Sequence, residues 1–127
     1  MTDKELLTLA GEARTRAYAP YSHFTVGAAL LCKDGTVYTG CNIENAAFTP
    51  TVCAERTAFF KAIYDGRREF ISIAVVGGKE GSPDATAFPC GVCRQVMAEF
   101  CASDFRIITP EGVYTLEQIL PHSFGGF

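Results

Sequence analysis

Three cysteines and one glutamate give this sequence of 127 residues its clearest chemical signal. Cys90 and Cys93 form a C-x-x-C pair, whose spacing brings two sulfurs close enough to share one tetrahedral zinc ion. The same pair occurs in redox centres, but there it follows a first strand, whereas here a strand and a long loop precede it. Cys53, at the start of the preceding predicted helix, is the candidate third ligand.

The predicted elements bring Cys53 to the C-x-x-C pair. In a β-α-β-α unit both helices begin at the same edge of the sheet, so sulfurs that are distant in the sequence meet there. Free N–H groups and the helix dipole at a helix N-terminus also stabilise thiolates. Three protein ligands leave the fourth position of zinc open, which is the arrangement of a catalytic site and not of a structural one.

Glu55 is the candidate proton carrier. A ligand two residues before a glutamate, followed later by Pro-Cys-x-x-Cys, is the pattern of zinc deaminases, in which the glutamate is the general acid and base. Residues i and i+2 do not share a face of a regular helix. We therefore expect Cys53 at the helix cap, where its sulfur turns toward the metal while Glu55 faces the bound water.

A positive charge is needed beside this site, because three thiolates outweigh the charge of one zinc ion. Arg56 adjoins the ligand run and is predicted to donate hydrogen bonds to the thiolates. Arg94 is a second candidate, although a solvent-facing helix charge explains it equally well.

A structural zinc site with four cysteines is the alternative. Cys32, Cys41 and Cys101 are the spare thiols, and free cysteines are often simply buried. Such a structural zinc module would bind a protein partner, and it would leave Glu55 without a role beside the metal.

Composition narrows the class of protein. Hydrophobic residues make up 48% and charged residues 20% of the chain, as in folded domains, and residues 1–127 are expected to form a single one. The net charge of −3 argues against a nucleic-acid partner. No apolar run approaches a membrane span, and the first residues do not resemble a signal peptide. We therefore expect a cytoplasmic protein without membrane contact, whose six cysteines are thiols or metal ligands.

Hydrophobic periodicity and turn residues predict an α/β fold. Strands are expected at residues 25–32, 37–41, 70–76, 105–109 and 113–115, and helices at 3–17, 53–64, 91–101 and 116–120. A hairpin followed by two β-α-β crossovers implies a mixed sheet of about five strands with helices on both faces. The expected architecture therefore has three layers, α/β/α.

At this level of detail the sequence resembles the small, homotetrameric, zinc-dependent cytidine deaminases. The resemblance covers nearly the whole chain. It rests on the motifs Tyr18-Ala19-Pro20-Tyr21-Ser22-His23-Phe24, Val26-Gly27-Ala28-Ala29, Asn42-Ile43-Glu44-Asn45-Ala46, Cys53-Ala54-Glu55-Arg56-Thr57, Pro89-Cys90-Gly91-Val92-Cys93-Arg94-Gln95, and Leu120-Pro121 with Phe124 near the end.

The resemblance implies a cytidine deaminase-like fold and the hydrolytic deamination of cytidine and 2′-deoxycytidine in pyrimidine salvage. It implies one zinc ion per subunit and a homotetramer whose active sites are shared between subunits. Phe24 would stack on the pyrimidine ring, Ala54 would contact the substrate, and Phe124 of a neighbouring subunit would close the pocket. Ala46 and Phe48 would contact a neighbouring subunit, and many relatives carry Tyr at the position of Phe48.

Asn42 and Glu44 support a ribose site through their own chemistry. They lie two residues apart at the end of a predicted strand, so their side chains point the same way. An amide and a carboxylate side by side can bind vicinal hydroxyl groups. Without the zinc motif, a polar strand end before a turn would explain them as well. Among enzymes, the alternative is a deaminase of blasticidin-type nucleosides, against which Asn42 and Glu44 argue for a plain ribose.

Overall fold

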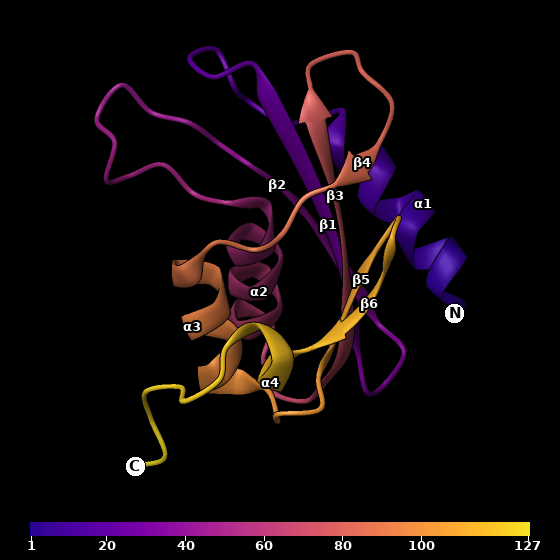
Figure 1. Cartoon of the computed structure of the whole chain (residues 1–127), viewed down its shortest axis with the longest axis vertical. Coiled ribbons are helices and arrows are strands. Elements are labelled where there is room, and N and C mark those ends of the chain that lie inside the picture. Colours follow the sequence, from indigo (N-terminus) through magenta and orange to yellow (C-terminus); the bar gives the residue numbers. More distant parts are fainter.

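A six-stranded mixed sheet separates helix α1 from helices α2 and α3 (Figure 1). The computed structural model describes residues 1–127. In chain order the elements are α1 (Asp3–Arg14), β1 (Phe24–Cys32), β2 (Val37–Cys41), α2 (Ala54–Tyr64), β3 (Phe70–Lys79), β4 (Ala85–Thr86), α3 (Gly91–Phe100), β5 (Arg106–Thr109), β6 (Gly112–Thr115) and α4 (Leu116–Ile119). The predicted three-layer α/β fold with a mixed sheet is confirmed.

The strand order β2-β1-β3-β5-β6 explains how α2 and α3 come to lie on one side of the sheet. β1 pairs antiparallel with β2 and with β3, whereas β3 and β5 are parallel. The chain therefore crosses over twice, through α2 between β2 and β3 and through α3 between β3 and β5. Successive crossovers to parallel strands bring the starts of α2 and α3 to the same edge of the sheet.

The structure differs from the sequence prediction at three places. The sheet has a sixth strand, β4, which is only two residues long and therefore leaves no periodic signal in the predicted loop. α1 ends at Arg14 instead of Ala17, because the next residues continue as a tighter turn in which Ala17 N–H bonds to the Arg14 carbonyl. β3 continues to Lys79 because its outer end pairs with the start of β1.

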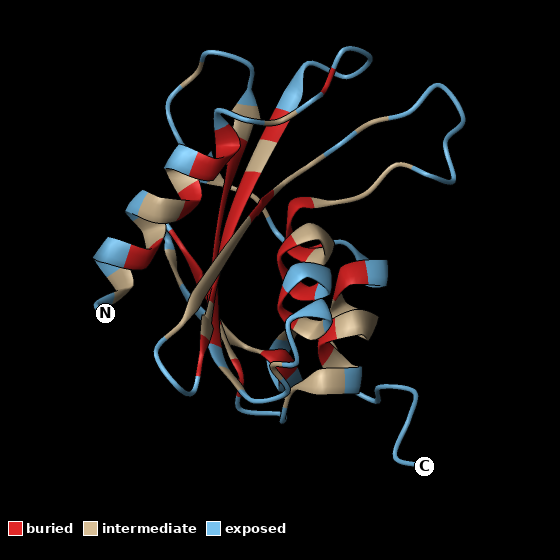
Figure 2. Cartoon of the chain, turned by 180° about the vertical axis from the view of Figure 1, so that it is seen from behind, coloured by how far each residue is buried: buried red, intermediate tan, exposed pale blue.

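Two hydrophobic cores hold the layers together, and Figure 2 shows the buried residues concentrated in the sheet and on the helix faces turned toward it. Phe59 of α2 is fully buried in the larger core, under α2 and α3. Its ring lies 5.2 Å from that of Phe70, 6.5 Å from that of Phe100 and 6.1 Å from that of Phe105, between ring centroids. This packing fixes α2 against the sheet and against α3.

Gly40 in β2 sets how closely α2 approaches the sheet. A Cβ atom there would lie 2.6 Å from the backbone nitrogen of Ala58 and closer still to the carbonyl oxygen of Ala54. The first turn of α2 therefore rests directly on β2, which only a glycine permits. None of the helices combines the length and the apolar character that a bilayer crossing requires.

Candidate active site and metal centre

The three predicted ligand sulfurs lie together at the helix starts. Cys53 is the N-cap of α2 and Cys90 the N-cap of α3, and neither side chain caps its own helix. Their sulfurs are 3.6 Å apart, Cys90 Sγ is also 3.6 Å from Cys93 Sγ, and all three lie within 4.8 Å of one another. Zn–S bonds of about 2.3 Å in a tetrahedron put sulfurs about 3.8 Å apart. The donor set and its spacing therefore fit a zinc ion.

The remaining cysteines do not join this cluster. Cys32 is buried at the end of β1, and Cys41 is partly buried at the end of β2. Burial raises the pKa of the Cys101 thiol to about 12, so that it stays protonated. A structural site with four cysteines is therefore absent, and the cluster keeps only three protein ligands.

Arg56 supplies positive charge at the sulfurs. Its Nη2 atom lies 3.3 Å from Cys53 Sγ, and its buried Nε atom has no hydrogen-bond partner. The pKa of the Cys53 thiol is lowered to about 5, chiefly by a hydrogen bond from the Cys93 thiol and to a smaller extent by hydrogen bonds from Arg56 and Cys90. Burial acts in the opposite direction and does not cancel this effect. The chain thus stabilises a thiolate at this position, which is the form that binds zinc.

Glu55 lies in the first turn of α2 and is only 3% exposed. Burial raises the pKa of its carboxyl group to about 7. A carboxyl group with such a pKa can both accept and release a proton near neutral pH. Because Glu55 is not part of the ligand cluster, its oxygens remain available for proton transfer.

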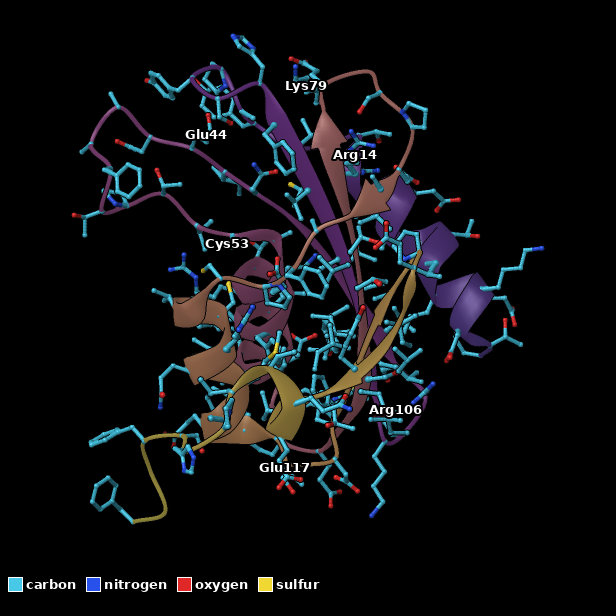
Figure 3. The ribbon with its side chains drawn as sticks, viewed as in Figure 1. Arg14, Glu44, Cys53, Lys79, Arg106 and Glu117 are labelled. Atoms are coloured by element: carbon cyan, nitrogen blue, oxygen red, sulfur yellow. The ribbon has the colours of Figure 1, made fainter.

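A cavity of about 380 Å³ opens above these groups, within the usual size range of small-molecule sites. Figure 3 shows Cys53 at the start of α2 and Glu44 on the long loop at the same end of the molecule. The lining residues are Ser22, Phe24, Val26, Asn42, Glu44, Phe48, Thr51, Val52, Cys53, Ala54, Glu55, Ala87, Phe88 and Cys90.

Comparison with known proteins is decisive at this point. The family of the cytidine and deoxycytidylate deaminase zinc-binding region matches residues 1–109. The chain belongs to this family. Zinc is accordingly its cofactor, the cluster of Cys53, Cys90 and Cys93 is a possible site for it, and the chain is a zinc-dependent hydrolase.

Individual relatives agree with the family. A cytidine deaminase of Sporosarcina psychrophila is 57% identical over 101 residues, which cover 80% of this chain and 71% of that protein. A cytidine deaminase of Halalkalibacterium halodurans is 48% identical over 130 residues, covering 98% of this chain and 95% of that protein. The crystal structure of a cytidine deaminase from Burkholderia pseudomallei superposes with a TM-score of 0.87 at 46% identity, over 98% of this chain and 100% of that chain.

In this deaminase the side chains of Asn42 and Glu44 in the pocket are held mainly by backbone groups of residues 21–26, at and before the start of β1. The Asn42 side chain accepts a hydrogen bond from Val26 N–H at 2.8 Å and donates one to the Phe24 carbonyl at 2.9 Å. Glu44 accepts hydrogen bonds from the N–H groups of Tyr21 and Ser22 and from the Ser22 hydroxyl group. These bonds fix both side chains while leaving each some hydrogen-bonding capacity.

Some pocket residues were not found from the sequence. Phe88 is half-exposed on the pocket wall, and its ring lies 5.2 Å from that of Tyr114 in an edge-to-face contact. Its position two residues before Cys90 could have indicated from the sequence that Phe88 lies at the pocket. Ser22, in the motif of residues 18–24, also lines the pocket.

Other predicted residues lie elsewhere. Arg94 is neither at the thiolates nor free in solvent: it donates hydrogen bonds to the Pro89 and Ile119 carbonyls. Phe124 is 74% exposed and Ala46 is exposed, and neither lines the pocket of its own chain. Phe48 lines its own chain's pocket although it is 90% exposed. Contacts of Phe124, Ala46 and Phe48 with a neighbouring subunit stay predictions.

Proposed function

We propose that this chain hydrolyses cytidine and 2′-deoxycytidine to uridine and 2′-deoxyuridine with release of ammonia, as a step of pyrimidine salvage. The whole of residues 1–127 would act as one deaminase domain. The observation that carries the proposal is the convergence of three sulfurs and the buried Glu55 on one cavity that also contains Phe24, Asn42 and Glu44.

Cys53, Cys90 and Cys93 would hold one zinc ion per subunit, and Arg56 would offset part of their negative charge. Zinc in such a site supplies Lewis-acid chemistry, lowering the pKa of a coordinated water molecule toward neutrality.

Glu55 would carry the protons of the reaction. It accepts one proton from the water molecule that attacks C4 of the pyrimidine and delivers that proton to ring N3. It then moves the second proton to the amino group, which leaves as ammonia while the C4 carbonyl forms. The oxygen of the water molecule stays in the product, and Glu55 ends in its starting state. The pKa of Glu55, which burial raises to about 7, suits this exchange.

The other pocket residues would orient the nucleoside. The exposed face of Phe24 offers a stacking surface for the ring, while the side chains of Asn42 and Glu44 would bind the ribose hydroxyl groups. Ala54, buried at the start of α2, would contact the base beside the metal.

A homotetramer with shared active sites is part of the proposal. Its support, beside the family resemblance, is that one chain leaves large apolar side chains exposed, and an interface that covers them would remove apolar area from water. The most exposed of them are Phe48, Tyr64, Phe124 and Phe127. Phe124 of one subunit would close the pocket of the next, and Ala46 and Phe48 would contact a neighbouring subunit. Free thiols throughout the chain favour the reducing cytoplasm.

The decisive experiment measures the loss of cytidine ultraviolet absorbance, with zinc content determined on the same sample. Cytidine and 2′-deoxycytidine should be consumed with release of ammonia, cytosine and blasticidin S much more slowly, and a chelator should abolish the reaction. Blasticidin S consumed faster than cytidine would favour the antibiotic deaminase. A zinc-loaded protein that consumes none of the four compounds would contradict the proposal and favour a structural zinc module.

A further inference from the structure

Arg94 joins two parts of the chain that are distant in sequence. It follows the ligand Cys93 directly on α3 and is partly buried. Its Nε atom donates to the Pro89 carbonyl at 2.8 Å, and its Nη1 atom donates to the Ile119 carbonyl at 2.7 Å. Pro89 immediately precedes the ligand Cys90, so one guanidinium group holds both the zinc-ligand loop and the end of α4.

The Ile119 carbonyl needs such a partner. It belongs to the last turn of α4, where carbonyl groups have no N–H donor within the helix. Pro121 cannot continue the helix, so no further turn brings an N–H group to this carbonyl.

Gln95, the residue after Arg94, binds the C-terminal segment at a point beyond α4. Its Nε2 atom donates to the Phe124 carbonyl at 3.0 Å. The main chain is thus held at Ile119 and at Phe124, while the Phe124 ring stays exposed and outside its own pocket. Figure 1 shows α4 beside α3 and the C-terminal segment leaving on the side of α3.

We infer that Arg94 and Gln95 are positioning residues for the deamination: Arg94 fixes the zinc-ligand loop to the C-terminal segment, and Gln95 orients the part of that segment that carries Phe124. The inference rests on the proposed function, in which Phe124 closes a neighbouring pocket. The order Cys93-Arg94-Gln95 then has a physical reason. Arg94 and Gln95 follow the last proposed ligand on α3, and they hold both the zinc-ligand loop and the segment with Phe124 to this one helix.

The test compares zinc release and exchange of the C-terminal segment in variants. Arg94→Lys keeps the charge, but a compact ammonium group cannot span both carbonyls in the geometry of the guanidinium fork. Zinc release to excess chelator should become on the order of tenfold faster, as for other losses of hydrogen bonds around metal ligands. Amide hydrogen exchange over residues 119–127 should also become faster. Arg106→Lys is the control, because the Arg106 side chain donates its hydrogen bonds to the Asp3 carboxylate in α1.

Gln95→Met separates the two anchors. It keeps the length of the side chain and removes the donor, so exchange over residues 119–127 should rise and KM for cytidine should increase, while zinc release and kcat stay near wild type. A general loss of structure would instead change zinc release as well.

Wild-type zinc release together with wild-type exchange in Arg94→Lys would overturn the inference for Arg94, and unchanged exchange and KM in Gln95→Met would overturn it for Gln95. If Arg94→Lys does not fold, Arg94→Gln, which keeps one amide donor, takes its place. Zinc release and exchange need no substrate, so a chain that binds zinc without deaminating cytidine would contradict only the proposed function.

Discussion

Ser22 illustrates how a single hydroxyl group serves two candidate substrate contacts. Its Oγ atom donates to the Glu44 carboxylate and accepts a hydrogen bond from Phe24 N–H at 3.0 Å. His23, which lies between Ser22 and Phe24 in the sequence, has a φ of 58°. This left-handed conformation turns the chain so that Phe24 N–H reaches the Ser22 hydroxyl group. The proposed ribose contact and the proposed stacking ring are therefore fixed to one another through Ser22.

Replacing Ser22 by Ala should raise KM for cytidine about tenfold with little change in kcat, because an interaction that positions the bound substrate is lost without touching the proton carrier. Ser22→Thr retains the hydroxyl group and should restore most of the affinity. Steady-state kinetics of both variants make the comparison. Equal KM values for Ser22→Ala and wild type would contradict this role, because Glu44 and Phe24 would then be positioned without the Ser22 hydroxyl group.

Glu55→Gln isolates proton transfer from the rest of the site. The amide has nearly the shape of the carboxyl group but cannot exchange protons, so kcat should fall by about 10²–10⁴-fold or more. Zinc content should stay at the wild-type level, because Glu55 is not in the ligand cluster, and thermal stability should not fall, because the neutral amide replaces a carboxyl group whose charged form burial disfavours. Turnover close to wild type in a zinc-loaded Glu55→Gln sample would contradict the proton-carrier assignment.

At the scale of elements, the site depends on how the first turn of α2 meets β2. That turn carries Glu55 and follows the candidate ligand Cys53, and its backbone packs closely on the sheet at Gly40. The site is thus sensitive to the spacing between a helix and a strand, although Gly40 lines no part of the pocket.

Gly40→Ala should therefore destabilise the protein and weaken zinc binding together. The added methyl group meets the backbone of α2, which cannot move without shifting Cys53, and overpacking of this kind typically costs about 1–3 kcal/mol. Denaturant unfolding and chelator competition measure the two effects. Gly112→Ala is the matched control, because a Cβ atom there meets only the Tyr114 hydroxyl oxygen at 3.9 Å. Equal stability of the two variants would contradict the close-packing account.

At the scale of the whole molecule, one chain carries both a pocket and an exposed aromatic residue that does not fill it. The pocket contains Glu55, whereas Phe124 is 74% exposed and lies outside. If active sites are shared between subunits, each functional site combines Glu55 of one chain with Phe124 of another.

Hybrid oligomers test this sharing. Glu55→Gln and Phe124→Ala homo-oligomers should each have low activity, in the first case from kcat and in the second from KM. Co-expression of the two variants should restore sites that combine an intact Glu55 with an intact Phe124, and activity at low cytidine concentration should exceed the sum of the separate variants. Strictly additive activity in a mixture shown to contain hybrids would rule out the sharing of sites.

The sequence indicated the fold and the metal chemistry because both are encoded at short range. Cys90 and Cys93 are candidate ligands that the sequence shows at a local spacing. The turn residues 33–36 predicted residues 37–41 as the returning strand of a hairpin, as observed for β2. The family resemblance added the roles of Phe24, Asn42 and Glu44. All three line the pocket, and their contacts with a nucleoside stay predictions.

By itself the sequence determined the order of all elements except β4, and the residue types that can bind zinc and move protons, since these depend on a few neighbouring positions. Only the tertiary structure decided that Arg94 donates hydrogen bonds to two carbonyl groups and that the Asn42 amide forms hydrogen bonds with the backbone of Phe24 and Val26 at the start of β1. Those bonds join segments far apart in the chain, and their partners follow from sheet register and helix packing. Hydrophobic periodicity shows which face of an element is buried, but not which distant backbone atom lies opposite a given side chain.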